Sequence, residues 1–477
     1  MTNEKNMFKK QTKIVATISD MRCDTEFINK LYREGVNVIR LNTAHQNVAD
    51  TVRVIKNIRE VSDRIAIMID LKGPELRTSF AQGPIEIENG ATVVLKGGKR
   101  EDVSSKDLLV INYPDFVSKV KVGTRVLIDD GELELEIVKK TKDKAICIAL
   151  NKGTIKSYKT VNVPSVKIDL PSLNKKDRDY LQFVVENDID FVAHSFVRRK
   201  QDVLDVQKVL DKAKSRVKII SKIENAEGVD NLDEIIAVSH GIMVARGDLG
   251  IEVPAEELPL IQKQIIRKCI LAQKPVIVAT QVMHSMIKNP RPTRAEVSDV
   301  ANAVLDGADA VMLSGETAFG DFPVETVKMM SKIIKRTEDY TDHYFYPPVT
   351  VVEKSITGHL IKSAVETAKK LDIKEIIVGD ETGFSSELLS SMRSRIPVYV
   401  KSSDKRIVRE LALAYGLNAN YVEKNVNHEV YIRSLLKVLV QKGKLKKNDL
   451  IIFLAGHPDK KIAANFMEIC EVSKYSK

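Results

Sequence analysis

Charged and hydroxyl side chains recur at the ends of short runs rich in Val and Ile along this sequence. One polar strand end is ordinarily a solvated end. Here the feature repeats at the ends of seven such runs: Arg40-Leu41-Asn42, Asp70-Leu71-Lys72, Ser195-Phe196-Val197-Arg198, Lys222-Ile223-Glu224, Arg246-Gly247-Asp248, Thr280-Gln281 and Ser314-Gly315-Glu316. The repetition predicts that these side chains meet and form a site.

The sharpest spacing is that of Lys222 and Glu224, which are two residues apart. On a strand, such residues point to the same side, so they form either a structural ion pair or a catalytic pair. Asp248 supplies a second carboxylate at the next strand end. Two carboxylates with few neutral ligands suit a hard cation such as Mg²⁺ or Mn²⁺. The sequence therefore predicts a divalent cation site.

Four basic side chains are expected at the same place: Arg40, Lys72, Lys222 and Arg246. Guanidinium and ammonium groups that converge in this way favour an anionic substrate that carries phosphate. By contrast, Thr293 and Glu296 form a T-x-x-E capping box, which indicates the start of a helix and no chemistry.

The elements that must position these residues alternate between strand and helix. The predicted strands are Lys13–Ile18, Val36–Leu41, Ile65–Ile69, Phe191–His194, Val217–Ser221, Gly241–Ala245, Val276–Ala279 and Ala310–Leu313. Their apolar runs are nearly continuous, as in parallel strands buried on both faces. Amphipathic segments such as Thr25 to Glu34 lie between them. Eight such units predict a closed (β/α)8 TIM barrel, whose active site lies at the carboxyl ends of the strands.

The long interval between the third and fourth strands breaks the repeat. It holds short alternating runs with turn residues at Gly97-Gly98, Gly123 and Asp130-Gly131. We therefore expect a small antiparallel β domain, a β-barrel, inserted after the third strand. After Tyr346-Pro347-Pro348 the alternation restarts as a C-terminal α/β domain with a mostly open sheet. The predicted domains are 1–78 with 165–346, 79–164, and 347–477.

The composition limits the class of protein. The chain has 477 residues, which at about 150 residues per domain suggests roughly three domains. Its formal charge of +10 is spread along the chain, so we expect no nucleic-acid partner. No apolar run is long enough for a membrane span, and Ile14–Ile18 is too short for a signal peptide. Four separate cysteines without a C-x-x-C pair fit a reducing compartment, so we expect a cytoplasmic protein.

Several of these runs closely resemble the pyruvate kinase family. They are Lys13–Ile18, Asn37–Asn42, the run Asp70-Leu71-Lys72-Gly73-Pro74-Glu75-Leu76-Arg77-Thr78, Ile219–Gly228, Ile242–Gly250, Pro292–Ala303 and Met312–Ala318. The resemblance implies transfer of a phosphoryl group from phosphoenolpyruvate to ADP, which gives pyruvate and ATP in the last step of glycolysis. It also implies Mg²⁺ (or Mn²⁺) and a homotetramer.

The resemblance also implies roles for individual residues. Glu224 and Asp248 would hold the divalent metal. Lys222 would face the charge that develops on the phosphoryl and enolate oxygens, and Arg40 would bind the phosphate. The other implied groups are Thr280 and the backbone of Ala245, Arg246, Gly247 and Asp248 for the substrate carboxylate, Ser314 for the proton route to pyruvate, and Asn42, His45, Arg77 and the inserted domain's Lys159 for the nucleotide. A lid that closes over the nucleotide would exclude water.

A monovalent cation site, usually for K⁺, departs from the family pattern. By resemblance its ligands would be Asn42, Asp70, Leu71 and a serine, but Ala44 stands at the serine position and has no side-chain oxygen. Glu75, which accompanies K⁺ dependence in this family, is present. We therefore expect a weakened K⁺ site.

The C-terminal domain departs more. In the family, a loop rich in Thr, Ser and Gly binds a sugar phosphate, and the matching segment here, 379–386, contains Asp380 and Glu381. Two carboxylates would repel a phosphate. The companion segment, 456–461, lacks the expected glycines. We therefore expect no tight activation by fructose bisphosphate.

Two other functions fit part of this sequence pattern. One is a different barrel enzyme that handles phosphoenolpyruvate or pyruvate, such as an aldolase or mutase. The nucleotide residues and the inserted domain argue against it. The other is a regulatory protein that has kept the fold with weak or no turnover, and only Ala44 and the altered C-terminal loops support it.

Overall fold

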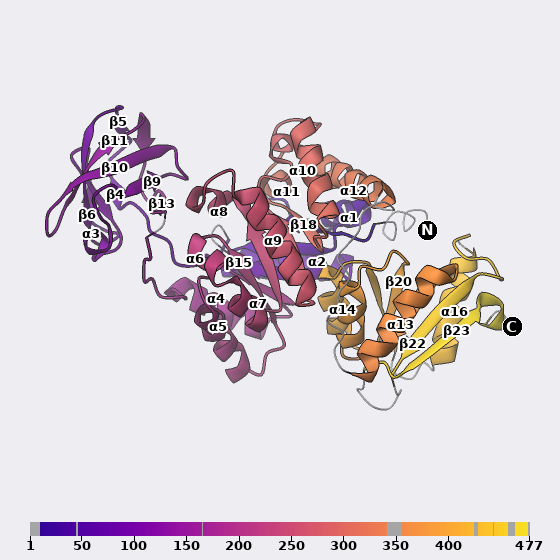
Figure 1. Cartoon of the computed structure of the whole chain (residues 1–477). Coiled ribbons are helices and arrows are strands. Elements are labelled where there is room, and N and C mark those ends of the chain that lie inside the picture. Colours follow the sequence, from indigo (N-terminus) through magenta and orange to yellow (C-terminus); the bar gives the residue numbers. More distant parts are fainter. Residues whose placement is uncertain are drawn as a thin grey trace.

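A closed eight-stranded parallel barrel forms the centre of the computed structural model, which describes residues 10–43, 46–164, 166–340, 355–423, 428–441, 443–456 and 463–475 (Figure 1). The barrel prediction is confirmed. Its strands close in the order β1, β18, β17, β16, β15, β14, β3, β2. They are β1 (Lys13–Thr17), β2 (Val38–Asn42), β3 (Ala66–Asp70), β14 (Phe191–His194), β15 (Lys218–Ile223), β16 (Gly241–Ala245), β17 (Val276–Ala279) and β18 (Ala310–Leu313).

Helices surround the barrel and pack their apolar faces on it. The main ones are α1 (Thr25–Glu34), α2 (Val48–Val61), α4 (Lys175–Glu186), α5 (Lys200–Lys212), α7 (Leu232–Val238), α9 (Leu258–Leu271), α10 (Arg294–Leu305) and α12 (Pro323–Tyr340). Short helices follow three strands: α6 (Ala226–Asp230), α8 (Arg246–Glu252) and α11 (Gly315–Ala318). Alternate strand residues separate into an inner core, which includes Met68 and Met243, and an outer core beneath the helices.

The inserted domain lies at one side of the barrel, where β3 ends (Figure 1). A six-stranded sheet in the order β13, β9, β10, β11, β6, β8 forms most of it. The strands are β4 (Phe80–Ala81), β5 (Ile85–Ile87), β6 (Thr92–Gly97), β7 (Val103–Ser104), β8 (Leu108–Ile111), β9 (Arg125–Ile128), β10 (Leu133–Lys140), β11 (Ala145–Ala149), β12 (Gly153–Ile155) and β13 (Val161–Asn162), with the short helix α3 (Phe116–Lys119).

The inserted domain was expected to be antiparallel, and this prediction is wrong in part, because two of its strand pairs are parallel. β6 and β8 are parallel, and so is the small pair β4 and β7. The chain between β6 and β8, which includes β7, forms the crossover that two parallel strands need. The alternating runs alone predict strands but not their direction. Below, this domain is called the lid.

The C-terminal domain lies on the side of the barrel away from the lid (Figure 1). Its sheet has the order β21, β20, β19, β22, β23, parallel except for the last pair. Its elements are α13 (Ile356–Lys370), β19 (Ile373–Gly379), α14 (Phe384–Ser391), β20 (Val398–Ser402), α15 (Lys405–Glu410), β21 (Leu417–Tyr421), α16 (His428–Gln441), β22 (Leu450–Ala455) and β23 (Phe466–Glu471). The expected α/β domain is confirmed, while our exact domain limits stay predictions.

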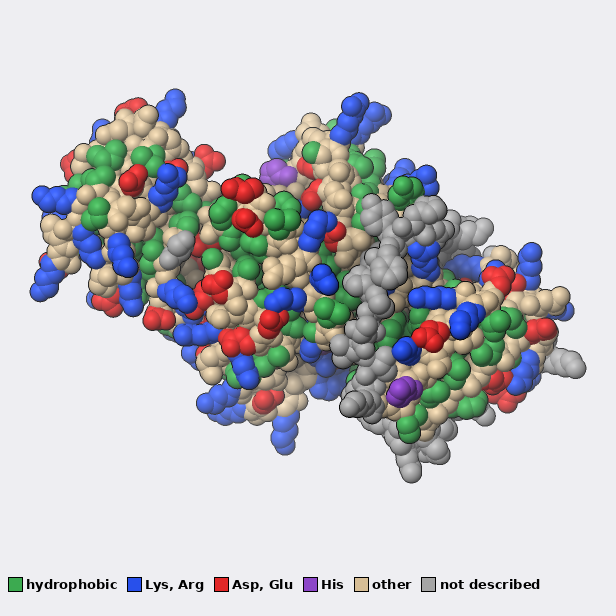
Figure 2. Space-filling view, viewed as in Figure 1, with side chains coloured by type: hydrophobic (Ala, Val, Ile, Leu, Met, Phe, Trp, Pro, Cys, Tyr) green, Lys and Arg blue, Asp and Glu red, His purple; other side chains and the backbone are tan. Residues whose placement is uncertain are grey.

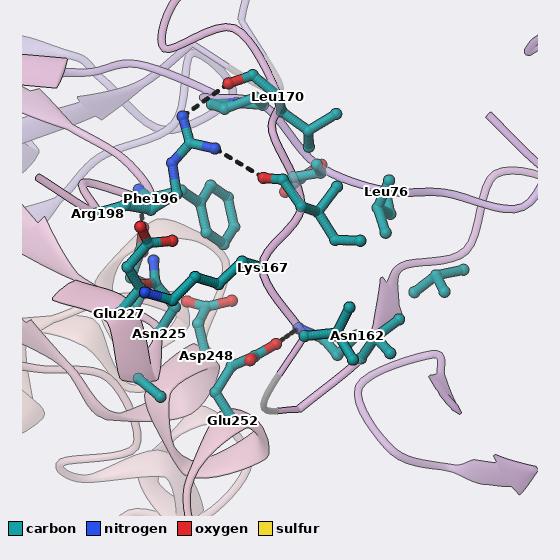
Figure 3. Close-up of a pocket in the computed structure, with 18 of the residues that line it drawn as sticks. Leu76, Asn162, Lys167, Leu170, Phe196, Arg198, Asn225, Glu227, Asp248 and Glu252 are labelled. Carbon is teal, nitrogen blue, oxygen red and sulfur yellow. Dashed lines mark hydrogen bonds between the residues drawn. The ribbon is translucent and has the colours of Figure 1, made fainter. Parts of the chain in front are cut away.

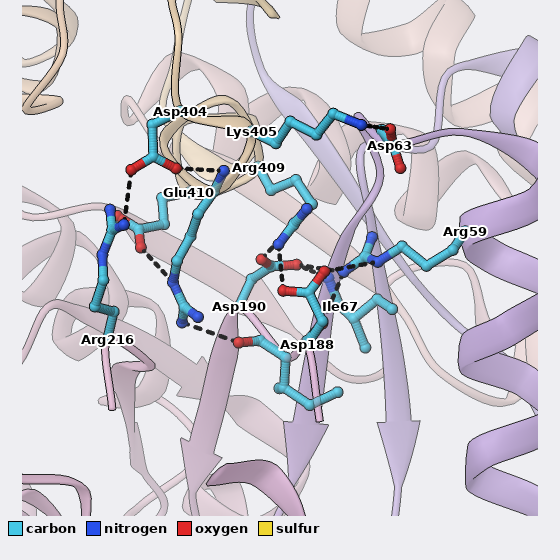
Figure 4. Close-up of polar contacts among 12 residues, drawn as sticks. Arg59, Asp63, Ile67, Asp188, Asp190, Arg216, Asp404, Lys405, Arg409 and Glu410 are labelled. Carbon is cyan, nitrogen blue, oxygen red and sulfur yellow. Dashed lines mark hydrogen bonds and ion pairs between the residues drawn. The ribbon is translucent and has the colours of Figure 1, made fainter. Parts of the chain in front are cut away.

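Ion pairs dock this domain on the amino ends of the barrel strands (Figure 4). Arg409 of α15 donates to Asp190 just before β14, with 2.7 Å from Nε to Oδ1. Asp190 also accepts from Ile67 N of β3 at 2.8 Å and from Arg59 Nη2 at 3.0 Å. A second buried pair joins Arg393 to Asp309, just before β18.

The surface has mixed charge. On the face shown in Figure 2, Lys and Arg side chains are interspersed with Asp and Glu. Within the described residues, no helix is both long and apolar enough to cross a membrane.

Candidate active site

The predicted residues of strands β2, β3 and β15 meet at the carboxyl end of the barrel. Arg40 Nε donates to Asp70 Oδ2 at 2.6 Å, and Arg40 Nη1 donates to Thr17 Oγ1 at 3.0 Å. Lys222 Nζ lies 3.3 Å from Asp70 Oδ1 and 2.9 Å from Glu224 Oε1. All of these side chains are buried. Neighbouring parallel strands have brought together groups from far apart in the sequence.

In this cluster, neighbouring opposite charges stabilise the ionised forms of Lys222 and Asp70. Burial opposes the charge on Lys222, but Asp70 and Glu224 outweigh it and raise the pKa of its ammonium above the usual value. Burial also opposes the charge on Asp70, but Arg40 and Lys222 outweigh it and lower the pKa of that carboxyl. Lys222 is therefore a cation at neutral pH, and a general-base role for it is disfavoured.

Glu224 and Asp248, the two expected metal ligands, differ from Asp70 because their pKa values are raised. Burial raises the pKa of Glu224, and the nearby Asp248 adds to the effect. Burial likewise raises the pKa of Asp248. Glu224 is buried and Asp248 is partly buried, and burial opposes the negative charge of both, so the two form a donor set that a divalent cation would neutralise. The described residues hold no group of three or more His, Cys, Asp or Glu side chains around a common point. The pair thus fits an ion such as Mg²⁺, which takes its other ligands from water and substrate.

Ser195 is a member of this cluster that the sequence placed at a strand end but gave no role. Its hydroxyl accepts from Lys222 Nζ at 2.7 Å and donates to the Leu71 carbonyl at 2.8 Å. The residue is buried, and a Cβ on Gly73 would come within 2.8 Å of the Ser195 Cβ. Its place directly after β14 was the available signal. Ser195 therefore fixes one side of the Lys222 ammonium.

Thr280 lies beside the first turn of α8 in an unusual backbone conformation. Its φ is +66°, which is rare for a β-branched residue. This conformation lets Thr280 Oγ1 accept from Gly247 N at 2.6 Å. The proposed carboxylate-binding groups, Thr280 and the backbone of Gly247, are thus adjacent. Such strain persists where the surrounding structure holds it in place.

Arg246 has a different position from the one we expected. Its guanidinium donates to Asp299 Oδ1 at 2.7 Å and to the Thr280 carbonyl at 2.9 Å. The side chain therefore braces the strained residue and ties α8 to α10. Only its backbone stays in our proposed substrate site.

Ser314 follows β18, and its Oγ is buried without a hydrogen-bond partner. Next to it, the carboxylate of Glu316 accepts from the backbone of Ser314 and of Met283. A buried hydroxyl without a protein partner is a position where water ordinarily completes the hydrogen bonding. This is the setting that a water-mediated proton route needs.

The proposed nucleotide residues lie partly together. Arg77 is on the segment that connects β3 to the lid, Lys159 lies inside the lid between β12 and β13, and Arg77 Nη1 donates to the Tyr158 carbonyl at 2.6 Å. Lys159 Nζ pairs with Asp129 at 2.7 Å. Asn42 ends β2, opposite Asp70 of β3. His45 lies outside the described residues.

The proposed K⁺ oxygens already have partners. Asp70 uses one oxygen for Arg40 and the other for Lys222, and the Leu71 carbonyl accepts from Ser195. A further cation here would lie next to two fixed positive charges. The described residues therefore fit a K⁺ ion poorly, and Ala44 lies outside them.

A cavity of about 340 Å³ opens beside Glu224 and Asp248, between the barrel and the lid (Figure 3). Its walls combine apolar side chains such as Phe196 and Leu170 with Asn162 and Glu252. Arg198 anchors the connecting segment on this side, since it donates to the carbonyls of Ile168 and Leu170. The site thus lies in the cleft beneath the lid.

In the C-terminal domain, both carboxylates of the altered loop are bound by the protein itself. Asp380 accepts from the backbone of Gly383 and Ser386 at 2.9 and 2.8 Å, at the start of α14. Glu381 accepts from the backbone of Ser403 at 2.9 Å, just before α15. These backbone donors at the starts of α14 and α15 are thus satisfied from within. Most of segment 456–461 lies outside the described residues.

Comparison with known proteins agrees with this geometry. Residues 9–327 match the family described as pyruvate kinase, barrel domain, and residues 359–470 match pyruvate kinase, alpha/beta domain. The chain is 46% identical over 468 residues to a pyruvate kinase of Borreliella burgdorferi, covering 97% of this chain and 98% of that protein.

Two further matches come from other organisms. A Geobacillus stearothermophilus pyruvate kinase is 41% identical, and the match covers 94% of this chain and 78% of that protein. A crystal structure of a pyruvate kinase from Cryptosporidium parvum superposes with a TM-score of 0.90 at 35% identity, covering 98% of this chain and 97% of that one. The chain belongs to the pyruvate kinase family.

Proposed function

We propose that this protein catalyses phosphoryl transfer from phosphoenolpyruvate to ADP, at the barrel mouth beneath the lid, to give pyruvate and ATP. The observation that carries the proposal is the Lys222 ammonium, which is held by Asp70, Ser195 and Glu224 beside the second carboxylate, Asp248. Phosphoryl transfer needs positioning and charge neutralisation more than covalent chemistry. This cluster offers both.

The basic residues act on the moving phosphoryl group. Lys222 neutralises charge on the phosphoryl oxygens and on the enolate oxygen left behind. Arg40, anchored by Asp70 and Thr17, binds the phosphate. Because both cations are fixed before substrate arrives, little reorganisation is needed when the bond breaks.

Glu224 and Asp248 are the residues that would hold Mg²⁺, an ion that the family generally uses. When bound, the ion supplies positive charge to substrate oxygens during transfer. Thr280 Oγ1 and the backbone of Gly247 receive the substrate carboxylate. To do so, Gly247 N must exchange its present hydrogen bond to Thr280 for one to the substrate.

The later proton and the nucleotide engage other residues. Ser314, whose buried hydroxyl has no hydrogen-bond partner, would pass a proton through water to the enolate. Arg77, before the lid, and Lys159, inside it, would bind the nucleotide phosphates, and Asn42 and His45 would complete that site. Closing the lid would then exclude water from the transfer.

Activity is tested by measuring ADP-dependent pyruvate formation by the purified full-length chain. Glu224→Ala should lose nearly all activity and also weaken Mn²⁺ binding, read from the electron paramagnetic resonance of free Mn²⁺. Glu325→Ala, an exposed position in the first turn of α12, is the matched control. A wild-type chain that binds both substrates but makes no pyruvate would instead favour a regulatory protein.

Two regulatory features follow from the same residues. We propose only weak activation by K⁺, since its oxygens are already engaged. Rates in K⁺ and in an organic cation at equal ionic strength should differ by less than about threefold. We also propose no tight fructose bisphosphate activation, because Asp380 and Glu381 satisfy the donors of the loop. A large leftward shift of the phosphoenolpyruvate saturation curve would contradict this.

For the assembly we propose a homotetramer, which is typical of the family. β23 ends the C-terminal sheet, with Phe466 and Ile469 exposed, and an apolar sheet edge favours pairing with another chain. Sedimentation of the full chain measures its mass. All four cysteines are free thiols, which supports the proposal that the enzyme works in the reducing cytoplasm.

A further inference from the structure

One hydrogen bond joins the lid directly to the helix that carries Asp248. Asn162 ends β13, the last strand of the lid, and its Nδ2 donates to Glu252 Oε1 at 2.8 Å. Glu252 is the last residue of α8. It lies four residues after Asp248, so the two carboxylates share one face of that helix, one turn apart. Figure 3 shows Asn162, Glu252 and Asp248 together at the cavity.

At the lid end of this bond, strand pairing connects Asn162 to the turn that contains Asp129 and Asp130. β13 pairs with β9, with Asn162 opposite Leu127 and Val161 opposite Ile128. The strand β9 leads straight into Asp129 and Asp130, and Asp130 lines the same cavity as Asp248. A movement of β13 therefore moves this turn as well.

The barrel end of the bond is connected to the substrate groups. The first turn of α8 contains Gly247 and Asp248, and Gly247 N is the donor to Thr280. The helix has only seven residues, so a pull on its last residue displaces its first turn.

We propose that Asn162 and Glu252 form a latch that sets the position of the lid and of Asp248 together. Both are positioning residues, since neither is placed on substrate. The proposal rests on the function proposed above and adds to it the contact by which the lid acts on the substrate site.

The chemistry of the pair suits this role. The cleft already contains the carboxylates of Glu75, Asp130, Glu224 and Asp248. An amide can donate to Glu252 without adding charge. A carboxylate at position 162 would repel Glu252 and push the lid away from α8. A glutamine at position 252 could still accept from Asn162, and it could also donate to an aspartate at position 162.

These properties give a rescue experiment on the full-length chain. The variants are Asn162→Asp, Glu252→Gln and the double variant. Arg125→Gln, which removes an exposed ion pair within the lid, is the matched control. The readouts are amide hydrogen exchange of β9, β13 and α8 by mass spectrometry, and kcat and KM for phosphoenolpyruvate.

Asn162→Asp should speed exchange in these three elements about tenfold and raise KM for phosphoenolpyruvate about fivefold. Glu252→Gln should stay within twofold of wild type, and the double variant should recover most of the loss. Fast exchange in the double variant equal to that of Asn162→Asp, or unchanged exchange in Asn162→Asp, would overturn the latch. If Asn162→Asp fails to fold, Glu252→Ala against Glu252→Gln makes the same comparison. The exchange readout needs no turnover, so failure of the latch and failure of the proposed function are distinguishable.

Discussion

The two ends of the barrel use the same kind of interaction for different purposes. At the amino end, the carboxylate oxygens of Asp190 and Asp309 each accept from an arginine, a backbone amide or both. At the carboxyl end, Asp70 is similarly satisfied, but Glu224 and Asp248 have raised pKa values and the Ser314 hydroxyl has no partner.

The difference separates docking from catalysis. The carboxylates at the amino end accept from arginines and backbone amides of two different domains, so they fix one domain on another. A cluster in which burial raises the pKa of two carboxylates beside fixed cations can bind a metal ion and an anionic substrate, at some cost in stability. Variants at the two ends should therefore fail in different ways.

The largest effect is expected at the catalytic end. Lys222→Met should lower kcat by about a thousandfold or more, because the charge on the transferring group loses its fixed cation. Initial rates of ADP-dependent pyruvate formation measure this. Activity within tenfold of wild type would show that Lys222 is structural and remove the distinction between the two ends.

The matching change at the docking end is Arg409→Met. It leaves the buried Asp190 without one of its cations, so the barrel and C-terminal domain should lose about 3 kcal/mol of stability. Urea unfolding monitored by circular dichroism measures the loss, while kcat of the folded fraction should stay within about threefold. Lys405→Met is the control, since its pair with Asp63 is exposed and such surface pairs add little to stability. A large fall in kcat without destabilisation would contradict the separation.

A third prediction concerns a buried carboxyl without a full set of partners, Glu375 of β19. Burial raises its pKa to about 8, and its Oε2 has no hydrogen-bond partner. The folded state thus holds a proton that the unfolded chain releases near its ordinary pKa. Stability should fall as pH rises from about 5 to 8, by about 2 kcal/mol between pH 6 and pH 8.

Glu375→Gln should remove this pH dependence and stabilise the C-terminal domain most at pH 8. Thermal unfolding at pH 6 and pH 8 tests the expectation. An equal effect of the substitution at both pH values would mean that Glu375 is already ionised in the folded protein.

The smallest effect is expected from a variant at the catalytic end that removes one hydrogen bond to Lys222. Ser195→Ala removes the hydroxyl that holds Lys222 and caps the Leu71 carbonyl, a loss of about 1 kcal/mol. We expect kcat to fall about fivefold with little change in KM for ADP. Ser172→Ala, which removes a hydroxyl bonded to Asp205 at 2.7 Å, is the control. A change in KM alone would place Ser195 in substrate binding instead.

The sequence predicted those parts of the molecule that depend on local pattern. The eight strands were found because strands buried on both faces must be apolar along their whole length. The start of α10 was found because Thr293 and Glu296 satisfy each other's backbone donors, as the structure confirms. The meeting of Arg40, Asp70, Lys222 and Glu224 was predicted because the ends of neighbouring parallel strands lie close together.

What the sequence could not give were the partners that each side chain chooses. Ser195 lies 27 residues from Lys222, Arg246 lies 53 from Asp299, and Asn162 lies 90 from Glu252. Such pairs form only after the strands have taken their register and the lid has docked. For the same reason, the sequence placed the Arg246 side chain among the substrate groups, whereas in the structure it donates to Asp299 and to the Thr280 carbonyl.

The sequence by itself thus determined the barrel, the inserted and C-terminal domains, and the residue types at the mouth, because apolar periodicity and strand-end chemistry are local properties. Only the tertiary structure decided which charged groups join two domains and which line the cavity. That distinction depends on burial and on distances between groups from separate elements. In this protein it marks the difference between the docking end and the catalytic end of one barrel.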